Sequence, residues 1–155
     1  TQIALMHRGQ LIVGVSSAPV YGELAWAELG KGAWLNDKPI KVSEIDSVEA
    51  GAISAGNLKT LASGPRWDRF GKLVARAHRI RGYGDFLHYH LLAAGKIDVV
   101  IESDVNILDV AACSVIVTAA GGKFTDLDGK PLTLDTTSVL AANGKLHSTV
   151  LSALG

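Results

Sequence analysis

Two carboxylates, Glu102 and Asp109, flank the junction of an apolar run and a helical pattern in the segment ESDVNILDVAACSVIVTAAGG. The run from Val99 predicts a strand that ends at Glu102, and Asp109 falls in the first turn of the following helix. Open α/β sheets bind ligands at the carboxyl ends of their strands, so both acids are expected to face one crevice. Carboxylate oxygens suit Mg²⁺, and a helix N-terminus favours a phosphate. Alternatively, Asp109 only caps its helix, and Glu102 and Asp104 are solvated residues at a strand end.

The helix that carries Asp109 is predicted to lie in the core. Its apolar residues repeat at helical spacing, and Gly121 with Gly122 predicts a left-handed cap at its end. Cys113 is the only cysteine, which excludes an internal disulfide, and it is expected to be a small buried residue. The predicted buried stripe consists of Leu108, Ala111, Ala112, Val115 and Ala119, with Ile116 and Val117 beside it.

Other motifs have weaker chemical interpretations. The DxDG of Asp126 to Gly129 resembles the start of an aspartyl-phosphatase signature, but a turn between two short strands explains the same residues. Ala52 to Gly56 approach a nucleophile elbow, although no convincing acid and histidine follow in suitable places. His88 and His90 are spaced i, i+2 on a predicted helix and so point in different directions, which disfavours a shared metal ion. Structural roles are predicted for both histidines.

The elements that must position these residues show two different patterns along the chain. Up to about residue 43, β-prone runs separated by turns predict an antiparallel meander that starts with a hairpin. From about residue 47, short apolar runs alternate with helical patterns, which predicts a layered α/β lobe. Predicted strands cover residues 2–6, 11–18, 24–28, 33–35, 51–55, 78–83, 99–102, 123–125 and 138–142. Predicted helices start after Pro65, after an N-cap at Asp85, near Leu108 and at about His147.

Length and composition narrow the class of protein. The 155 residues suffice for one domain with a full core, or for one domain and part of another. Lysine plus arginine and aspartate plus glutamate number 15 each, so no nucleic-acid or membrane partner is expected. No apolar run reaches the roughly 18 residues of a membrane span, and a soluble, cytoplasmic protein is expected. Because Thr1 opens directly into a strand-like run, we expect an earlier part to be absent, with a short natural N-terminus as the alternative.

Several segments, in order along nearly the whole chain, resemble the inositol monophosphatase family. RGYGDFLHYHLLAAGKIDVVIE (81–102), LDVAA (108–112) and AAGG (119–122) are similar to the family's C-terminal half. GKGAWLNDKPIKVS (30–43) is similar to its GxGAFxNGxPIxVS stretch, and TDLDGKPL (125–132) to its final hairpin. The YGD of residues 83–85, with a nearby Tyr89, resembles most closely the bacterial histidinol-phosphate phosphatases within this family.

This resemblance implies a Mg²⁺-dependent phosphatase acting on a small phosphorylated metabolite. Asp109 corresponds to the metal-ligating aspartate of the family's WDxAA signature, with Leu108 where tryptophan is usual. Glu102 is similar to the residue that accepts a hydrogen bond from the non-phosphate part of the substrate. Asp85 and Glu102 could together pair with the ammonium of histidinol phosphate. The runner-up substrate is inositol 1-phosphate or a related sugar phosphate.

The resemblance also sets expectations for the architecture. The fold class is α/β, an α+β layered sandwich, with residues 1–45 as remaining strands of an N-terminal antiparallel domain and 46–155 as a C-terminal α/β domain. The family's DPxDGT signature and an upstream glutamate supply most metal ligands and do not occur here. We therefore expect a C-terminal part of the enzyme, with no catalytic residue of its own, in a homodimer. The alternative from another class is a non-catalytic binding or dimerisation fragment.

Overall fold

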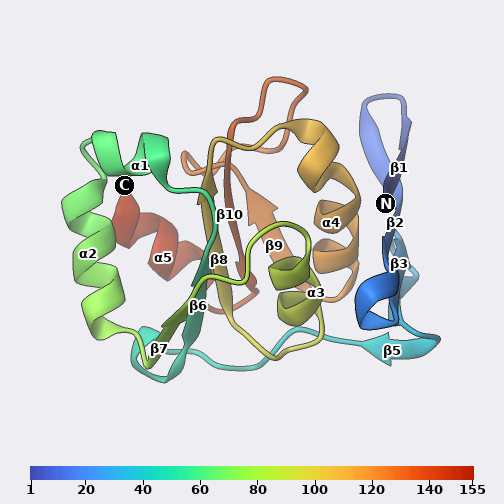
Figure 1. Ribbon diagram of the computed structural model, residues 1–155, viewed down its shortest axis with the longest axis horizontal. Coiled ribbons are helices and arrows are strands. Elements are labelled where there is room, and N and C mark those ends of the chain that lie inside the picture. The colour runs from blue at the N-terminus through green and yellow to red at the C-terminus, as the bar shows by residue number, and fades with distance from the viewer.

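The computed structural model describes residues 1–155, which form two β-sheets with helices between them and on one outer side (Figure 1). The layers follow the order first sheet, α3 and α4, second sheet, and then α1, α2 and α5. The strands are β1 (Gln2–His7), β2 (Gln10–Ala18), β3 (Glu23–Glu28), β4 (Gly32–Leu35), β5 (Lys38–Ile40), β6 (Ala52–Ala55), β7 (Arg79–Arg81), β8 (Val99–Ser103), β9 (Gly122–Thr125) and β10 (Ser138–Asn143). The helices are α1 (Lys59–Ser63), α2 (Trp67–Arg76), α3 (Leu87–Ala93), α4 (Ile107–Ala119) and α5 (His147–Leu154), with 3₁₀ turns at Pro19–Tyr21 and Val48–Ala50.

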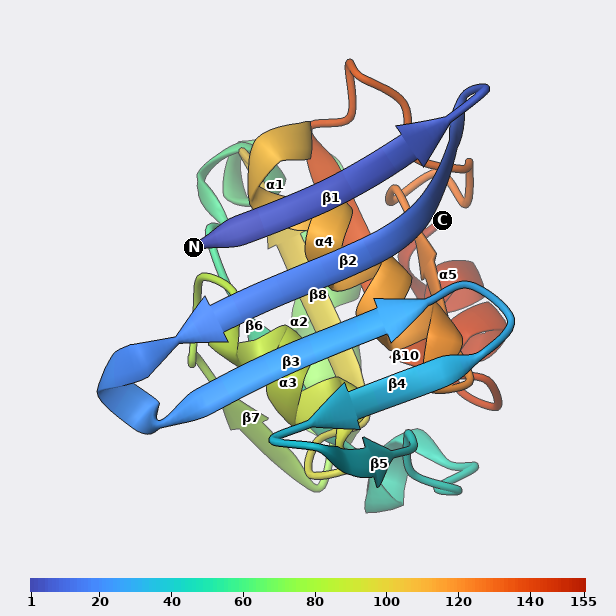
Figure 2. The same ribbon diagram turned by 90° about the vertical axis from the view of Figure 1, so that its right-hand side faces the viewer.

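The first sheet is an antiparallel meander in the order β1-β2-β3-β4-β5 (Figure 2). Arg8 and Gly9 at its first turn have φ angles of 50° and 80°, the left-handed pair that suits a tight hairpin, so the predicted hairpin is confirmed. The face toward α4 carries small residues. A Cβ added to Gly14 would lie 2.4 Å from the carbonyl oxygen of Ala112, so α4 can approach β2 this closely only because Gly14 has no side chain.

The second sheet has the order β7-β6-β8-β10-β9. Strand β6 pairs in parallel with β7 and β8, whereas β10 pairs antiparallel with β8 and β9. Every residue of β8 is buried, because helices cover both faces of this sheet. The strand–helix alternation predicted for this half of the chain is confirmed. Glu102 lies near the carboxyl end of β8, the central strand of this sheet.

Helix α4 is the central helix and is buried along most of its length, as predicted, with Cys113 fully buried. Leu108 was expected in the buried stripe, and this prediction is wrong, since the residue is 80% exposed. It lies in the first turn of α4, which leaves it outside the packed layer, whereas burial begins at Val110. Gly121 has a φ angle of 94°, which confirms the predicted left-handed cap.

The two sheets contribute to one hydrophobic cluster around α4. Ala25 and Ala27 of the first sheet belong to it together with Val100 and Val139 of the second. A second cluster fills the space between the second sheet and helices α2 and α5. The division of the chain into domains at residues 45 and 46 therefore stays a prediction. None of the helices is both long and apolar enough to cross a bilayer.

Candidate active site

A cleft of about 400 Å³ opens where β8 ends and α4 begins. Glu102, Asp109 and Asp85 all line it, so the structure brings together the three acids that the sequence predicted as site residues. Its size lies within the range of small-molecule sites. The other lining residues are Gln2, Asn57, Phe86, Tyr89, Asp104, Val105 and Val110.

Asp109 is exposed and lies in the first turn of α4. Its Oδ2 accepts a hydrogen bond from the backbone N–H of Asn106 at 3.1 Å, while Oδ1 of Asn106 accepts from the N–H of Leu108 at 2.8 Å. This reciprocal arrangement is a capping box, so Asp109 does cap its helix. Its Oδ1 has no hydrogen-bond partner in the chain, which leaves that oxygen free for a ligand in the cleft.

Glu102 is only 5% exposed, and two donors share one of its carboxylate oxygens. Oε2 accepts from the Tyr89 hydroxyl at 2.5 Å and lies 3.1 Å from Nε2 of His88. Burial, and after it the neighbouring charge of Glu102, raises the pKa of Tyr89 well above its usual range, so Tyr89 stays a neutral donor. The Glu102 carboxylate is therefore held in one orientation in the wall of the cleft.

The hydrogen bonds of Glu102 continue into the interior. Nδ1 of His88 lies 3.2 Å from the hydroxyl oxygen of Ser54, which also accepts from the backbone N–H of Tyr83 at 3.3 Å. Ser54 and His88 are fully buried. A substrate cannot reach Ser54, so this chain of atoms is not a nucleophile with its base, although the residue types match a Ser–His–Glu triad. Sequence reasoning missed this connection because its members stand on different elements.

Asp85 is exposed at the cleft and precedes α3. Its prediction as the N-cap of that helix is wrong: the N-cap is Phe86, and no side chain caps the helix. The physical reason is that Gly84 and Asp85 both adopt left-handed conformations, with φ angles of 68° and 46°, which turn the chain before α3 begins. The Asp85 carboxylate forms no hydrogen bond within the chain and remains open to a ligand.

Asp104 borders the cleft but is held by α1. Its carboxylate accepts from the backbone N–H of Thr60 at 2.9 Å, from the Thr60 hydroxyl, and from Ser103. These hydrogen bonds, the one from the Thr60 hydroxyl foremost, lower the pKa of Asp104. The sequence predicts Asp104 only as a solvated residue at a strand end. Its φ angle of 58°, rare for a non-glycine residue, could not be read from the sequence.

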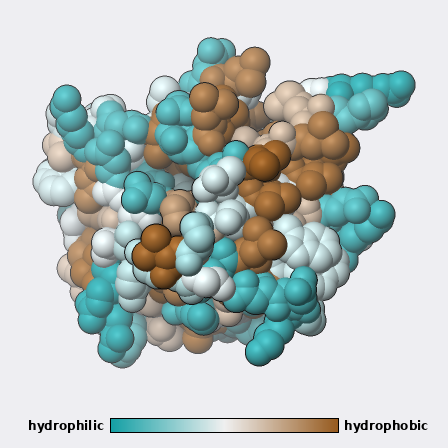
Figure 3. Space-filling view, turned by 45° about the vertical axis from the view of Figure 1, so that its right-hand side comes forward, coloured by the Kyte–Doolittle hydropathy of each residue, from teal (hydrophilic) through white to brown (hydrophobic).

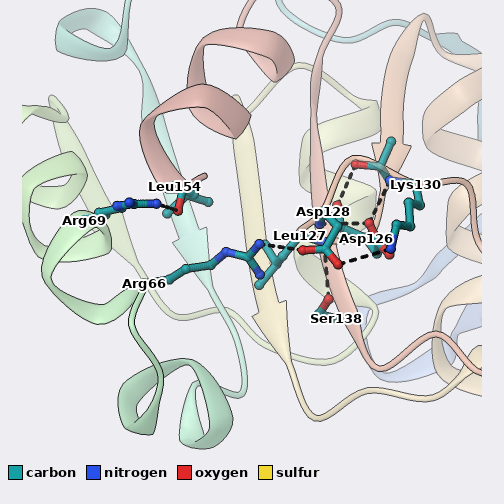
Figure 4. A network of polar contacts seen from close by, with 9 residues as sticks. Arg66, Arg69, Asp126, Leu127, Asp128, Lys130, Ser138 and Leu154 are labelled. Carbon is teal, nitrogen blue, oxygen red and sulfur yellow. Dashed lines mark hydrogen bonds and ion pairs between the residues drawn. The ribbon is translucent and has the colours of Figure 1, made fainter.

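The DxDG motif forms a turn outside the cleft (Figure 4). Oδ1 of Asp126 accepts from the backbone N–H groups of Asp128 and Lys130 at 2.8 and 2.7 Å, and Gly129 has a φ angle of 79°. Asp128 pairs with Arg66 at 2.5 Å, beside a second cavity of about 520 Å³. The predicted turn is confirmed, although only β9 precedes it and no strand follows directly.

His90 points away from His88, as its spacing predicted. Its Nδ1 lies 2.9 Å from a Glu23 carboxylate oxygen and its Nε2 lies 2.6 Å from the Ser16 hydroxyl. His90 is 1% exposed and connects α3 to the first sheet. The predicted structural role is confirmed for His90, whereas His88 contacts an acid of the cleft.

The cleft offers oxygen ligands of the kind that Mg²⁺ prefers. The free Oδ1 of Asp109 fits one position in the shell of such an ion. No group of three or more histidine, cysteine, aspartate or glutamate side chains is arranged to hold a metal ion. The residues present therefore fit a metal that takes one carboxylate from this chain and its remaining ligands from elsewhere.

The chain was compared with known proteins. The model of the inositol monophosphatase family matches residues 1–155. The chain is 37% identical to a histidinol-phosphatase of Mycobacterium tuberculosis, covering 98% of this chain and 60% of that protein. It is 33% identical to an inositol-1-monophosphatase of Bacillus subtilis, covering 96% of this chain and 57% of that protein.

A similar solved structure is that of the inositol monophosphatase of Anabaena. It superposes with a TM-score of 0.89 at 31% identity and covers 99% of this chain and 62% of that one. The layered α/β fold that the resemblance implied is thereby confirmed. The chain spans about 60% of the length of the first curated relatives it matches. With the family model matched along all its residues, the chain belongs to the inositol monophosphatase family.

Proposed function

We propose that this chain forms part of the active site of a Mg²⁺-dependent phosphatase that hydrolyses histidinol phosphate, a step of L-histidine biosynthesis. The observation that carries the proposal is the convergence of Asp109, Glu102 and Asp85 on one cleft at the junction of β8 and α4. Relatives named histidinol-phosphatase, at 37% and 34% identity, support the choice of substrate.

Asp109 would hold Mg²⁺ through its free Oδ1 while its Oδ2 remains in the capping box. When bound, the metal supplies an activated water and stabilises the departing alkoxide. Since the chain groups no three ligating side chains, we infer that further ligands belong to parts of the whole protein that this chain does not contain. The N-terminus of α4 adds partial positive charge next to Asp109 and favours the phosphate group.

Glu102 and Asp85 would bind the ammonium of histidinol phosphate. Glu102 presents an anion from a buried wall, where a charge-assisted hydrogen bond is strong. Asp85 stands exposed at the same cleft with no partner in the chain, so it can pair with a cation without breaking an existing contact. Inositol 1-phosphate has hydroxyl groups instead of this cation and would gain less from two carboxylates.

Phosphate release from the whole protein tests the choice of substrate. With Mg²⁺ present, we expect a higher kcat/KM for histidinol phosphate than for inositol 1-phosphate. A preference for inositol 1-phosphate would establish the second candidate, which the relatives of that name at 33% and 31% identity support. The absence of Mg²⁺-dependent turnover with either substrate would favour the non-catalytic binding or dimerisation fragment.

We further propose that the whole enzyme is a cytoplasmic homodimer. Cys113 of this chain is buried and forms no disulfide, as is usual for proteins of a reducing compartment. Apolar side chains remain at the surface on the side where the first sheet lies (Figure 3). Ile3 and Leu5 of β1 and Val20 of the 3₁₀ turn after β2 are 60%, 54% and 91% exposed, and exposed apolar patches often mark an interface. Sedimentation velocity on the whole protein tests this state, and a monomer would contradict it.

A further inference from the structure

The two oxygens of the Glu102 carboxylate have different surroundings. Oε2 receives both protein donors, the Tyr89 hydroxyl and the His88 ring. Oε1 forms no hydrogen bond within the chain and lies against Gly56. A Cβ added to Gly56 would fall 1.7 Å from Oε1. Oε1 can therefore occupy this position only because Gly56 has no side chain. Only Oε1 is left for a ligand.

The hydrogen bonds around His88 determine which nitrogen carries its proton. The Ser54 oxygen accepts from the backbone N–H of Tyr83, so its own hydrogen is free to be donated to Nδ1 of His88. Oε2 of the Glu102 carboxylate can only accept, so Nε2 of His88, 3.1 Å away, must carry the hydrogen of this contact, and Ser54 donates to Nδ1. The donor sequence runs in one direction, from Tyr83 through Ser54 and His88 to Glu102.

These groups are held where they cannot rearrange easily. Ser54 and His88 are 0% exposed, and Tyr89 is 1% exposed. They come from β6 and α3, two elements packed against β8, which carries Glu102. A carboxylate fixed by two donors from such a shell keeps its direction.

From this arrangement we propose that Ser54, His88 and Tyr89 are positioning residues that fix Glu102 with Oε1 toward the non-phosphate part of the substrate. The proposal rests on the proposed function for the identity of that substrate. These residues act on recognition through Glu102 and do not touch the reacting phosphate. Their contribution is therefore expected in the KM for substrates that carry an ammonium, and not in kcat.

Two measurements test the proposal, and the first does not depend on activity. The ¹⁵N chemical shifts of His88 in the labelled protein should show hydrogen on Nε2 and none on Nδ1, and Ser54→Ala should weaken this preference. Hydrogen on Nδ1 with none on Nε2 would overturn the proposal, because Nε2 of His88 could not then donate to Glu102.

The second measurement compares KM for histidinol phosphate with KM for p-nitrophenyl phosphate, which has no ammonium, in the whole enzyme with Mg²⁺. His88→Phe and Tyr89→Phe should raise the ratio of the two values roughly tenfold, and His88→Gln, which keeps a donor, should recover part of it. His90→Phe is the matched control, because it removes an equally buried histidine of α3 that contacts the first sheet, and should keep the ratio.

The outcomes separate the two proposals. An unchanged ratio in His88→Phe and Tyr89→Phe, or an equal change in His90→Phe, would overturn the positioning role. Wild-type enzyme that shows the expected His88 hydrogen but hydrolyses neither compound would refute the proposed function and leave the fixed carboxylate standing as a binding group.

Discussion

At the scale of single residues, the capping role of Asp109 leaves room for the proposed role as a metal ligand. One of its oxygens completes the capping box of α4, and the other has no partner in the chain. A helix cap and a metal ligand are therefore compatible in one side chain. The two oxygens of Glu102 differ in the same way: Oε2 accepts from two donors, and Oε1 has no partner in the chain.

Asp109→Asn in the whole enzyme should lower kcat strongly. Loss of a hydrogen-bond partner behind a metal ligand already costs about 10- to 100-fold, so loss of the ligand charge should cost at least about 100-fold. Steady-state phosphate release measures this. Asn106→Ala serves as a control, because it removes the cap residue but not the proposed ligand and should reduce stability by about 1 kcal/mol. A near-normal rate in Asp109→Asn would leave that residue only its capping role.

Gly56→Ala should displace the Glu102 side chain, because the new Cβ would lie 1.7 Å from Oε1. Overpacking of this kind costs about 1–3 kcal/mol, and KM for histidinol phosphate should rise at the same time. Chemical denaturation and kinetics measure the two effects. Gly71→Ala is the matched control: no atom outside the backbone of α2 lies within 4 Å of its Cβ position, so it should stabilise by up to about 1 kcal/mol. Equal effects of the two changes would contradict this explanation.

At the scale of elements, the helix and the strand that the sequence did not predict, α1 and β5, are both short. Helix α1 has only Lys59–Ser63 and no side-chain cap, and β5 has only Lys38–Ile40. Both are too short to show a periodicity of their own. Helix α1 nevertheless matters for the cleft, because Thr60 holds Asp104 there.

His147 joins α5 to β9 and should make stability depend on pH. Its Nε2 lies 2.9 Å from the Thr125 hydroxyl oxygen, and burial, followed by the nearby charge of Lys123, lowers the pKa of His147. The unfolded chain therefore takes up a proton more readily, so stability is fully present above the ordinary pKa of about 6.5 and falls as the pH drops through the folded-state value. His147→Gln should flatten this loss in thermal unfolding curves, whereas His7→Gln, at the exposed end of β1, should not.

Asp98, just before β8, forms hydrogen bonds with Ser43, in the segment between the two sheets, and with Ala52 at the start of β6. Its buried carboxylate accepts from the Ser43 hydroxyl and from the backbone N–H of Ala52 at 2.7 Å. Asp98→Ala would leave these donors unpaired and should reduce the free energy of unfolding by about 1–3 kcal/mol. Urea denaturation measures it, with the exposed Asp135→Ala as control. Because Asp98 precedes β8 and Glu102 lies near its other end, KM should change little.

At the scale of the whole molecule, α4 lies between two sheets and contacts both. The sheets share one apolar cluster around it, so the position of Asp109 depends on residues from both halves of the chain. Small residues on the first sheet allow this packing, above all Gly14 beside Ala112. The site is thus a product of the layered fold as a whole.

The whole enzyme and this chain alone should respond differently to Mg²⁺. In the whole enzyme, chelation with EDTA should stop phosphate release, and added Mg²⁺ should restore it. In the chain alone, Mg²⁺ should leave the midpoint of thermal unfolding unchanged, since no three ligating side chains are grouped and only bound metal stabilises. Scanning fluorimetry measures the midpoint. A clear rise for the chain alone would show a complete metal site within it.

The sequence by itself determined what local patterns encode. Turn residues predicted the first hairpin and the Asp126–Gly129 turn, and apolar periodicity predicted α4 and α5 and the strand that ends near Glu102. The strand–helix junction singled out Glu102 and Asp109, and the family resemblance added Asp85; all three line one cleft. Their roles as ligands remain predictions.

Only the tertiary structure decided what depends on residues that are distant in sequence. It joined Ser54 and His88 to Glu102, connected Thr60 to Asp104, and left Leu108 in the solvent. The physical reason is that periodicity and turn chemistry act over a few residues, whereas burial and hydrogen-bond partners are set by how the sheets and helices pack. The cleft acids could be named from the sequence, but the groups that hold them could not.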